Sequence, residues 1–158
     1  MRQLYLACVL MSVSGLLNAA IIPAPPESNL KAYFVMDATT GFVIAERAAD
    51  EVLPPASLTK LMTSYVLAYE IETGRVSPDD LVRVSENAWA QNPLFKGSSL
   101  MWLEPGMEVK VSDIERGVVI SSGNDATVAI AEHLAGSESA FVGMMNTHAN
   151  RLGMSASY

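Results

Sequence analysis

Ser57 and Lys60 are the two residues whose types and spacing best suit covalent chemistry. They stand three positions apart and follow directly on Pro54 and Pro55. The prolines disfavour a helix upstream, and residues 57–72 contain no Pro or Gly, so the sequence predicts a helix beginning near Ser57. Residues three apart lie about one helical turn from each other, and the hydroxyl can therefore meet the amine.

This pair has two interpretations. A serine hydroxyl is a weak nucleophile until a neighbouring base takes its proton, and a lysine can act as that base if its surroundings lower its pKa. In the alternative, Ser57 is a helix N-cap and Lys60 is a solvated lysine of the first turn. Ser-x-x-Lys is a short pattern that also arises by chance, so the pair alone leaves both open.

A second polar group, Ser122-Gly123-Asn124, interrupts an otherwise apolar helical pattern. Gly123 lowers helix stability, and the flanking side chains are polar where their neighbours are apolar. Ser122 or Asn124 could cap the next helix. The other interpretation is catalytic, with a hydroxyl that relays a proton and an amide that binds a substrate carbonyl.

The elements that must position these groups can be predicted from periodicity. Residues 32–36 and 42–46 are strand-like runs joined by a turn with Gly41, which indicates an antiparallel hairpin. In both runs, the residues that point to either side of the strand are apolar, so we expect both faces of the hairpin to be covered. The helix from Ser57 should end near Gly74 and bury one apolar face, formed by Leu61, Met62, Tyr65, Val66 and Tyr69.

Further helices are expected in the second half of the chain. Ser112 and Glu115 form a capping-box pattern that predicts a helix over 112–120. An alanine-rich helix over 126–134 should end at Gly136, and a last one over 139–152 should be capped by Ser137. Residues 81–84 read as extended, and Ser85 is expected to cap a short helical turn through Trp89. Residues 95–102 form an irregular segment of the kind that lines sites.

The first 20 residues have the layout of a secretory signal peptide. Arg2 precedes an apolar stretch, and small residues follow it at Ala19 and Ala20. A transmembrane anchor is the alternative, but the stretch is short and is interrupted by Ser12 and Ser14. Residues 21–30, rich in proline, are then a linker. The protein is expected to be exported, to the periplasm or the outer face of the cytoplasmic membrane.

Composition excludes several classes of function. The formal net charge is -7, and loss of Arg2 with the signal makes it more negative, so nucleic acid is not an expected partner. The single cysteine, Cys8, lies in the signal, which leaves no thiol nucleophile and no disulfide. His133 and His148 lack ligand partners at metal spacing, so we predict no metal site and no cofactor.

Taken together, the motifs resemble the penicillin-binding-protein and serine beta-lactamase superfamily, and most closely the D-alanyl-D-alanine carboxypeptidases of low molecular mass. The resemblance covers nearly the whole chain after the signal. It rests on the stretches around Ser57, Gly97 and Asn124 and on the run from Gly136 to Asn146. It implies an α+β fold of the beta-lactamase/DD-peptidase kind, here mainly the helical region with an N-terminal hairpin.

The resemblance also implies a mechanism. Ser57 would attack the carbonyl between two terminal D-alanines of a peptidoglycan pentapeptide stem, with Lys60 as its base. Ser122 would help to protonate the departing D-alanine, and Asn124 would bind the substrate backbone. Beta-lactam antibiotics would acylate the same serine. No cofactor is implied, and membrane association would occur only through a C-terminal anchor that is absent from this chain.

One departure from the family pattern bears on activity. The family's third motif, Lys-Thr-Gly, does not occur in this sequence. Residues 31–158 are therefore expected to be the N-terminal part of a truncated DD-peptidase domain, with the remaining sheet strands missing and the hairpin's apolar surface exposed. The alternatives are a beta-lactamase or transpeptidase of the same superfamily, and an inactive fragment that only binds cell-wall peptide.

Overall fold

The computed structural model describes residues 26–158, so the proposed signal peptide and the first part of the linker lie outside the described residues. The described chain forms two compact units, one ending at Leu53 and one comprising Pro54–Tyr158. Each unit is described by itself.

The first unit is the predicted hairpin. Strands β1 (Tyr33–Met36) and β2 (Val43–Arg47) pair antiparallel, with Tyr33 opposite Arg47 and an irregularity between Val35 and Met36. In the turn, the Asp37 carboxylate accepts hydrogen bonds from Thr39 and Thr40, which lower its pKa. Local turn chemistry therefore fixes the connection, as the sequence predicts.

The expectation that both faces of this hairpin are covered is wrong for the described chain. Its apolar side chains are 40–58% exposed: Phe34, Val35, Met36, Phe42, Val43 and Ile44. Two strands carry too little surface to bury one another's apolar side chains, and an isolated hairpin is at best marginally stable in water. The exposed apolar surface agrees with the exposure that the sequence analysis expects for the hairpin.

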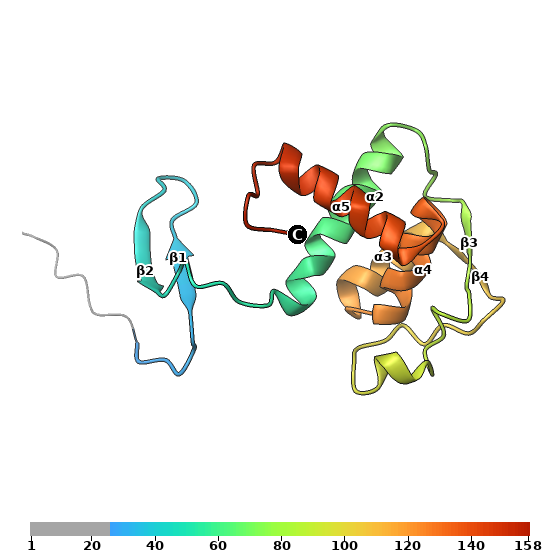
Figure 1. Cartoon of the computed structure of the whole chain (residues 1–158), viewed down its shortest axis with the longest axis horizontal. Helices are drawn as coiled ribbons and strands as arrows, with labels where there is room; N and C mark the ends of the chain where they lie inside the picture. Colours follow the sequence, from blue (N-terminus) through green and yellow to red (C-terminus); the bar gives the residue numbers. More distant parts are fainter. Residues whose placement is uncertain (1–25) are drawn as a thin grey trace, which may run out of the picture. The chain divides into compact units, whose positions relative to one another are not determined.

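The second unit contains four helices and a small antiparallel strand pair (Figure 1). The helices are α2 (Thr59–Glu72), α3 (Val111–Ile120), α4 (Asn124–Ala135) and α5 (Glu138–Arg151). The strands are β3 (Leu81–Arg83) and β4 (Glu108–Lys110), and two 3-10 turns are η1 (Ala56–Leu58) and η2 (Pro93–Phe95). The α+β class is confirmed.

Most predicted helix ends are confirmed. Gly136, in the left-handed conformation with φ 77°, ends α4, and the Ser137 hydroxyl accepts a hydrogen bond from Ala140 N at the start of α5. The helix over 57–72 begins as η1 and continues as α2. These ends could be predicted because glycine and serine act locally on the backbone.

Two local predictions are wrong. Helix α3 begins at Val111, before the capping box, because β4 runs directly into it. The backbone N–H groups of Val111 and Ser112 donate instead to the carbonyls of Asp80 and Pro78. Residues 85–89 form a turn rather than a helix, although the Ser85 hydroxyl does accept a hydrogen bond from Ala88 N.

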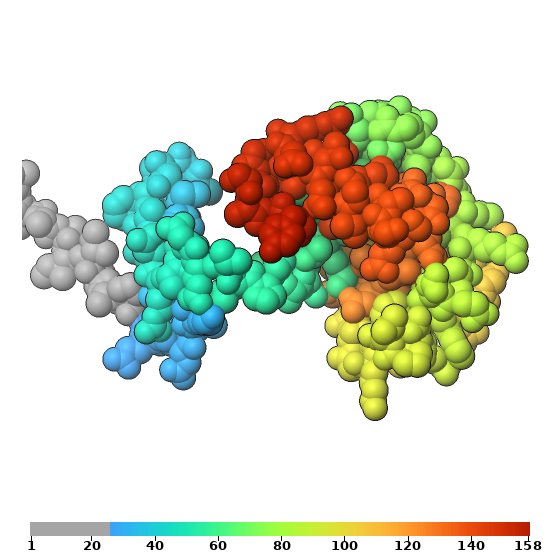
Figure 2. All heavy atoms as spheres, viewed as in Figure 1, coloured from blue at the N-terminus to red at the C-terminus, as the bar shows by residue number. Residues whose placement is uncertain are grey.

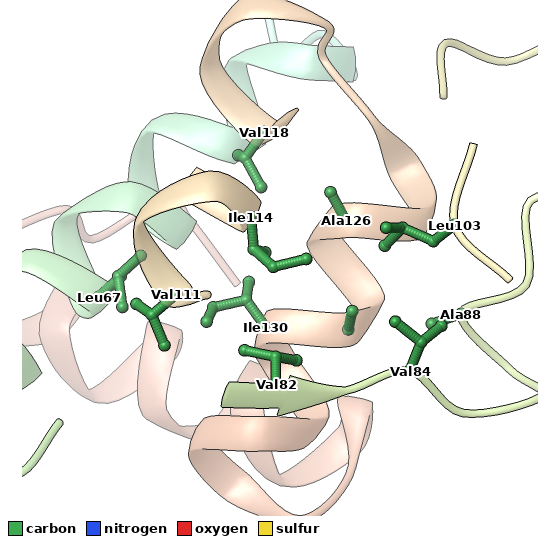
Figure 3. Packing of buried hydrophobic residues seen from close by; sticks show 11 residues of the cluster. Leu67, Val82, Val84, Ala88, Leu103, Val111, Ile114, Val118, Ala126 and Ile130 are labelled. Atoms are coloured by element: carbon green, nitrogen blue, oxygen red, sulfur yellow. The ribbon is translucent and has the colours of Figure 1, made fainter. Parts of the chain in front are cut away.

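The core of this unit lies between α2, α3, α4 and β3. Figure 3 shows Leu67, Val82, Val111, Ile114 and Ile130 converging from these four elements. All five are less than 2% exposed. Burial of this apolar surface is the main force that holds α2 against the α3–α4 pair, and with it the groups at their ends.

The buried face of α2 differs from the predicted one. Val66 and Leu67 are buried, but Leu61 is 70% and Tyr65 is 42% exposed. The buried positions also include Thr63 and Glu70, so the face that packs is rotated away from the most apolar stripe. The sequence pattern could not show this, because nearly every side of the helix carries an apolar residue.

The connection between β3 and β4 contains the irregular segment predicted around residues 95–102. In the space-filling view its yellow-green and yellow spheres form one end of the unit (Figure 2). Phe95 and Leu103 anchor it, being 8% and 3% exposed, whereas Leu94 and Trp102 are 88% and 71% exposed. Phe95 and Leu103 thus anchor the segment, while the side chains of Leu94 and Trp102 face solvent.

Candidate active site

Ser57 and Lys60 meet at the start of the central helix. Ser57 lies in η1 and is exposed, while Lys60 lies in the first turn of α2 and is partly buried. The Lys60 Nζ atom lies 3.5 Å from the Ser57 Oγ atom. The predicted contact between hydroxyl and amine is therefore present, although it is long for a hydrogen bond.

The break between α3 and α4 brings the second motif to the same place. Gly123 N donates to the carbonyl of Gly117, which closes the end of α3, and α4 begins at Asn124. The Ser122 hydroxyl lies 3.1 Å from the Ser57 hydroxyl and donates a hydrogen bond to it. Two serine side chains distant in the sequence thus share one hydrogen bond.

Asn124 completes the cluster from the first position of α4. Its Oδ1 atom accepts a hydrogen bond from Lys60 Nζ at 2.7 Å. The capping interpretations are wrong, because neither α2 nor α4 has a side-chain N-cap hydrogen bond. The four predicted site residues are instead bonded to one another.

The surroundings of Lys60 favour its neutral form. Burial lowers the pKa of its amine from the usual value of 10.5, since a charged group loses hydration there. Among the described residues, no carboxylate forms an ion pair with this lysine. A partly desolvated lysine without a counter-ion can accept a proton from a neighbouring hydroxyl.

The backbone on both sides of the contact is strained. Ala56, next to Ser57, has φ 48° and Ser122 has φ 51°, and both lie in the left-handed region that disfavours residues with a Cβ. Such conformations persist where the surrounding structure over-determines them, and they cluster at functional sites. The strained residues here are Ala56, which precedes Ser57, and Ser122 itself.

Asp125 was not among the site residues predicted from the sequence. This residue is fully buried, and its carboxylate accepts hydrogen bonds from Met101 N at 2.8 Å and Leu103 N at 3.0 Å. Next to it, Asn124 N donates to the carbonyl of Ser99 at 2.9 Å. The one available signal was a carboxylate at the start of an alanine-rich apolar helix, where burial is unusual for an acid.

The histidines lie away from this cluster. His133 is exposed, and His148 is buried against the edges of Tyr65 and Tyr69, with ring centroids 5.5 and 4.7 Å away. Over residues 26–158, no three His, Cys, Asp or Glu side chains gather as metal ligands would. The exposed Asp79 carboxylate pairs with Lys110 at 2.8 Å.

A pocket of about 270 Å³ lies where α2 meets α5. Tyr69, Glu70, Arg75 and His148 contribute to its lining, and no residue of the Ser57 cluster does. Glu70 and Arg75 pair across it, which lowers the pKa of the carboxyl. Within the described part of the chain, no helix has the length and apolar character needed to span a bilayer.

Comparison with known proteins identifies close relatives. The sequence model of a family described as D-alanyl-D-alanine carboxypeptidase matches residues 19–157. The D-alanyl-D-alanine carboxypeptidase DacA of Escherichia coli K12 is 50% identical over 135 residues, which is 85% of this chain and 34% of that protein. DacF of Bacillus subtilis is 40% identical over 124 residues, covering 78% of this chain and 31% of its own length.

Solved structures agree with this result. Penicillin binding protein 5 from Haemophilus influenzae superposes with a TM-score of 0.76 at 40% identity, over 83% of this chain and 38% of that one. Penicillin binding protein 6B from Escherichia coli gives a TM-score of 0.74 at 46% identity, over 86% and 43%. The chain spans about a third of the length of the curated relatives it matches.

Proposed function

Because this chain belongs to the D-alanyl-D-alanine carboxypeptidase family, we propose that Ser57 is the nucleophile of a serine-type D-Ala-D-Ala carboxypeptidase. The observation that carries the proposal is the pair of contacts made by its Oγ atom, 3.1 Å from the Ser122 hydroxyl and 3.5 Å from Lys60 Nζ. A nucleophile, a candidate base and a second hydroxyl thereby converge on one exposed point.

In the first step, the Ser57 oxygen attacks the carbonyl carbon of the penultimate D-alanine. Its proton passes to the neutral amine of Lys60, directly or through the Ser122 hydroxyl. The C–N bond then breaks, and Ser122 delivers a proton to the departing nitrogen while it takes the proton held by Lys60 in return. The terminal D-alanine leaves with its amino group restored, and the peptide remains as an ester on Ser57.

In the second step, water hydrolyses this ester and returns the proton to Ser57. The backbone N–H of Ser57 contributes one donor to the oxyanion formed in each step. Asn124 binds the peptide backbone, and its hydrogen bond to Lys60 keeps the amine in reach of the hydroxyl. A beta-lactam acylates the same oxygen, because its strained amide opens without losing a leaving group.

Intact-mass spectrometry after incubation with benzylpenicillin tests the nucleophile. Ring opening loses no atoms, so the expected adduct adds the full mass of the penicillin. The Ser57→Ala variant is the control and should remain unmodified. A folded wild-type chain without an adduct contradicts the proposal, and so does an adduct that persists in Ser57→Ala.

A second candidate function is favoured by one sequence observation. The chain has no Lys-Thr-Gly motif, which in the family supplies a second oxyanion donor and binds the substrate carboxylate. The second candidate function is binding of a cell-wall peptide without hydrolysis. Release of free D-alanine from a pentapeptide separates the two functions. Rapid turnover of penicillin would instead identify a beta-lactamase.

Export is a further part of the proposal. It is supported by the sequence of residues 1–20, in which Arg2 precedes an apolar stretch and small residues follow. Expression in a bacterium, fractionation and N-terminal sequencing of the periplasmic product test it. A start near Ala20 or Ile21 agrees with a cleaved signal, whereas retention of Met1 in the membrane fraction indicates an anchor.

A further inference from the structure

Asp125 is the buried acid with the most specific set of contacts in the described chain. Its Oδ1 atom accepts from Met101 N at 2.8 Å and from Ala126 N at 2.9 Å, and its Oδ2 atom accepts from Leu103 N at 3.0 Å. No described cation pairs with it. A buried carboxylate without a counter-ion depends on such donors and on the positive end of its helix.

Met101 and Leu103 belong to a segment that further contacts hold next to the start of α4. Leu103 is 3% exposed in the core, and its carbonyl accepts from Ala90 N at 2.9 Å. A Cβ atom on Gly123 would lie 3.0 Å from Met101 N and 2.9 Å from Asp125 Oδ1. Glycine at 123 therefore permits an approach of the two backbones that any other residue would obstruct.

The segment also carries Trp102, which has φ 67° and is 71% exposed. A positive φ is a clear outlier for so bulky a residue. The two amides that Asp125 holds, at 101 and 103, flank this tryptophan. The carboxylate therefore fastens the backbone on both sides of the strained residue and maintains its conformation.

These contacts converge on Asn124. Its backbone N–H is bonded to Ser99 of the segment, its side chain accepts from Lys60, and Asp125 follows it directly. Resting on the function proposed above, we infer that Asp125 is a positioning residue for acylation. Its carboxylate fastens residues 99–103 to the start of α4, and so holds Asn124 against Lys60 and Ser122 against Ser57.

The experiment compares Asp125→Asn with Asp113→Asn in the full chain. The amide keeps the shape of the side chain but replaces one acceptor by a donor that faces an N–H group. Asp113 lies on α3, where it pairs with Arg116 at the surface. Stopped-flow acylation by a fluorescent penicillin separates the binding constant from the acylation rate constant, and thermal melting monitors folding.

We expect Asp125→Asn to lower the acylation rate constant by about tenfold or more, because small misplacements in a site have large effects on rate. The binding constant should change less, and Asp113→Asn should match wild type. A folded Asp125→Asn protein with an acylation rate constant within about twofold of wild type would overturn the inference. If Asp125 had a purely structural role, Asp125→Asn would lower the melting temperature and leave the acylation rate constant unchanged.

A second variant avoids the change of charge. Gly123→Ala pushes the Met101 amide away from Asp125 and should lower the acylation rate constant in the same direction. If Asp125→Asn does not fold, Gly123→Ala tests the positioning role in its place. A folded Gly123→Ala protein that is acylated at the wild-type rate overturns the inference.

A readout independent of acylation separates this inference from the proposed function. In ¹H–¹⁵N NMR spectra of the full chain, Asp125→Asn should shift the side-chain amide signals of Asn124, whereas Asp113→Asn should not. If wild type is not acylated but these signals shift, the proposed function fails and the positioning role stands. Unchanged Asn124 signals in both variants overturn the positioning role itself.

Discussion

Lys60 and Asn124, 64 positions apart, are joined by a hydrogen bond of 2.7 Å, which is shorter than the 3.5 Å between Lys60 and Ser57. The amide oxygen accepts from the protonated amine and stabilises its charge, while burial opposes that charge and lowers the pKa. The amine of Lys60 is thus held toward Asn124, and in the proposed mechanism only its neutral form takes the proton of Ser57.

The acylation rate should therefore depend on pH. Because burial lowers the pKa of Lys60 below 10.5, the rate constant with penicillin should rise with pH, and the midpoint of that rise should lie below 10.5. Stopped-flow measurements between neutral and alkaline pH test this. Lys60→Arg, whose side chain stays charged, should be slower by about a hundredfold or more. A profile that is flat in wild type would contradict a lysine base.

Asn124→Asp changes the same contact without changing its shape. A carboxylate in place of the amide adds a negative charge next to Lys60 Nζ and should raise the pKa of the amine. Acylation should then slow at neutral pH, and the rise of the rate constant should move to higher pH. Asn146→Asp, on α5 away from the cluster, is the control and should leave the profile in place.

Much of the site could be predicted from the sequence because its chemistry is local. A spacing of three positions along a helix brings Ser57 and Lys60 together. A glycine between polar residues indicates the break between α3 and α4. That Asn124 would bond to Lys60 depends on how α2 packs against α4, which periodicity does not encode. Asp125 was not predicted, because its partners are backbone amides, which every residue except proline carries whatever its side chain.

The core should respond to truncation at Ile114 on α3. This side chain is 0% exposed between α2, α4 and β3, so Ile114→Ala should lower the free energy of unfolding by about 2–5 kcal/mol. Val119→Ala, on the same helix but 65% exposed, should change it little. Urea denaturation of both variants gives the comparison, and equal losses would mean that the helix faces are assigned wrongly.

The Glu70–Arg75 pair predicts a pH-dependent part of stability. Arg75 lowers the pKa of the Glu70 carboxyl in the folded state, so the pair stabilises the fold above the unfolded pKa. That stabilisation is lost as pH falls through the lowered folded value. Glu70→Gln should therefore be less stable than wild type at neutral pH and approach it in acid. Glu72→Gln, an exposed site on α2, is the matched control for thermal melting at each pH.

The hairpin should make the protein prone to association. Phe34 on β1 and Ile44 on β2 are 52% and 54% exposed. Replacing both by Thr should reduce light scattering at high concentration, since less apolar surface is exposed. Val142→Thr on α5 controls for the loss of one apolar residue elsewhere. Unchanged scattering in the double variant would show that these two side chains do not drive association.

The left-handed backbone at Ala56 and Ser122 has a consequence for how such a site survives in evolution. Each conformation costs about 1–2 kcal/mol for a residue with a Cβ, a cost that glycine avoids. Relief of that strain is available through single substitutions at either position. In a lineage that no longer needs the proposed reaction, substitution of residues 56 and 122 by glycine would stabilise the fold. Retention of residues with a Cβ at these two positions would then indicate that selection still maintains the reaction.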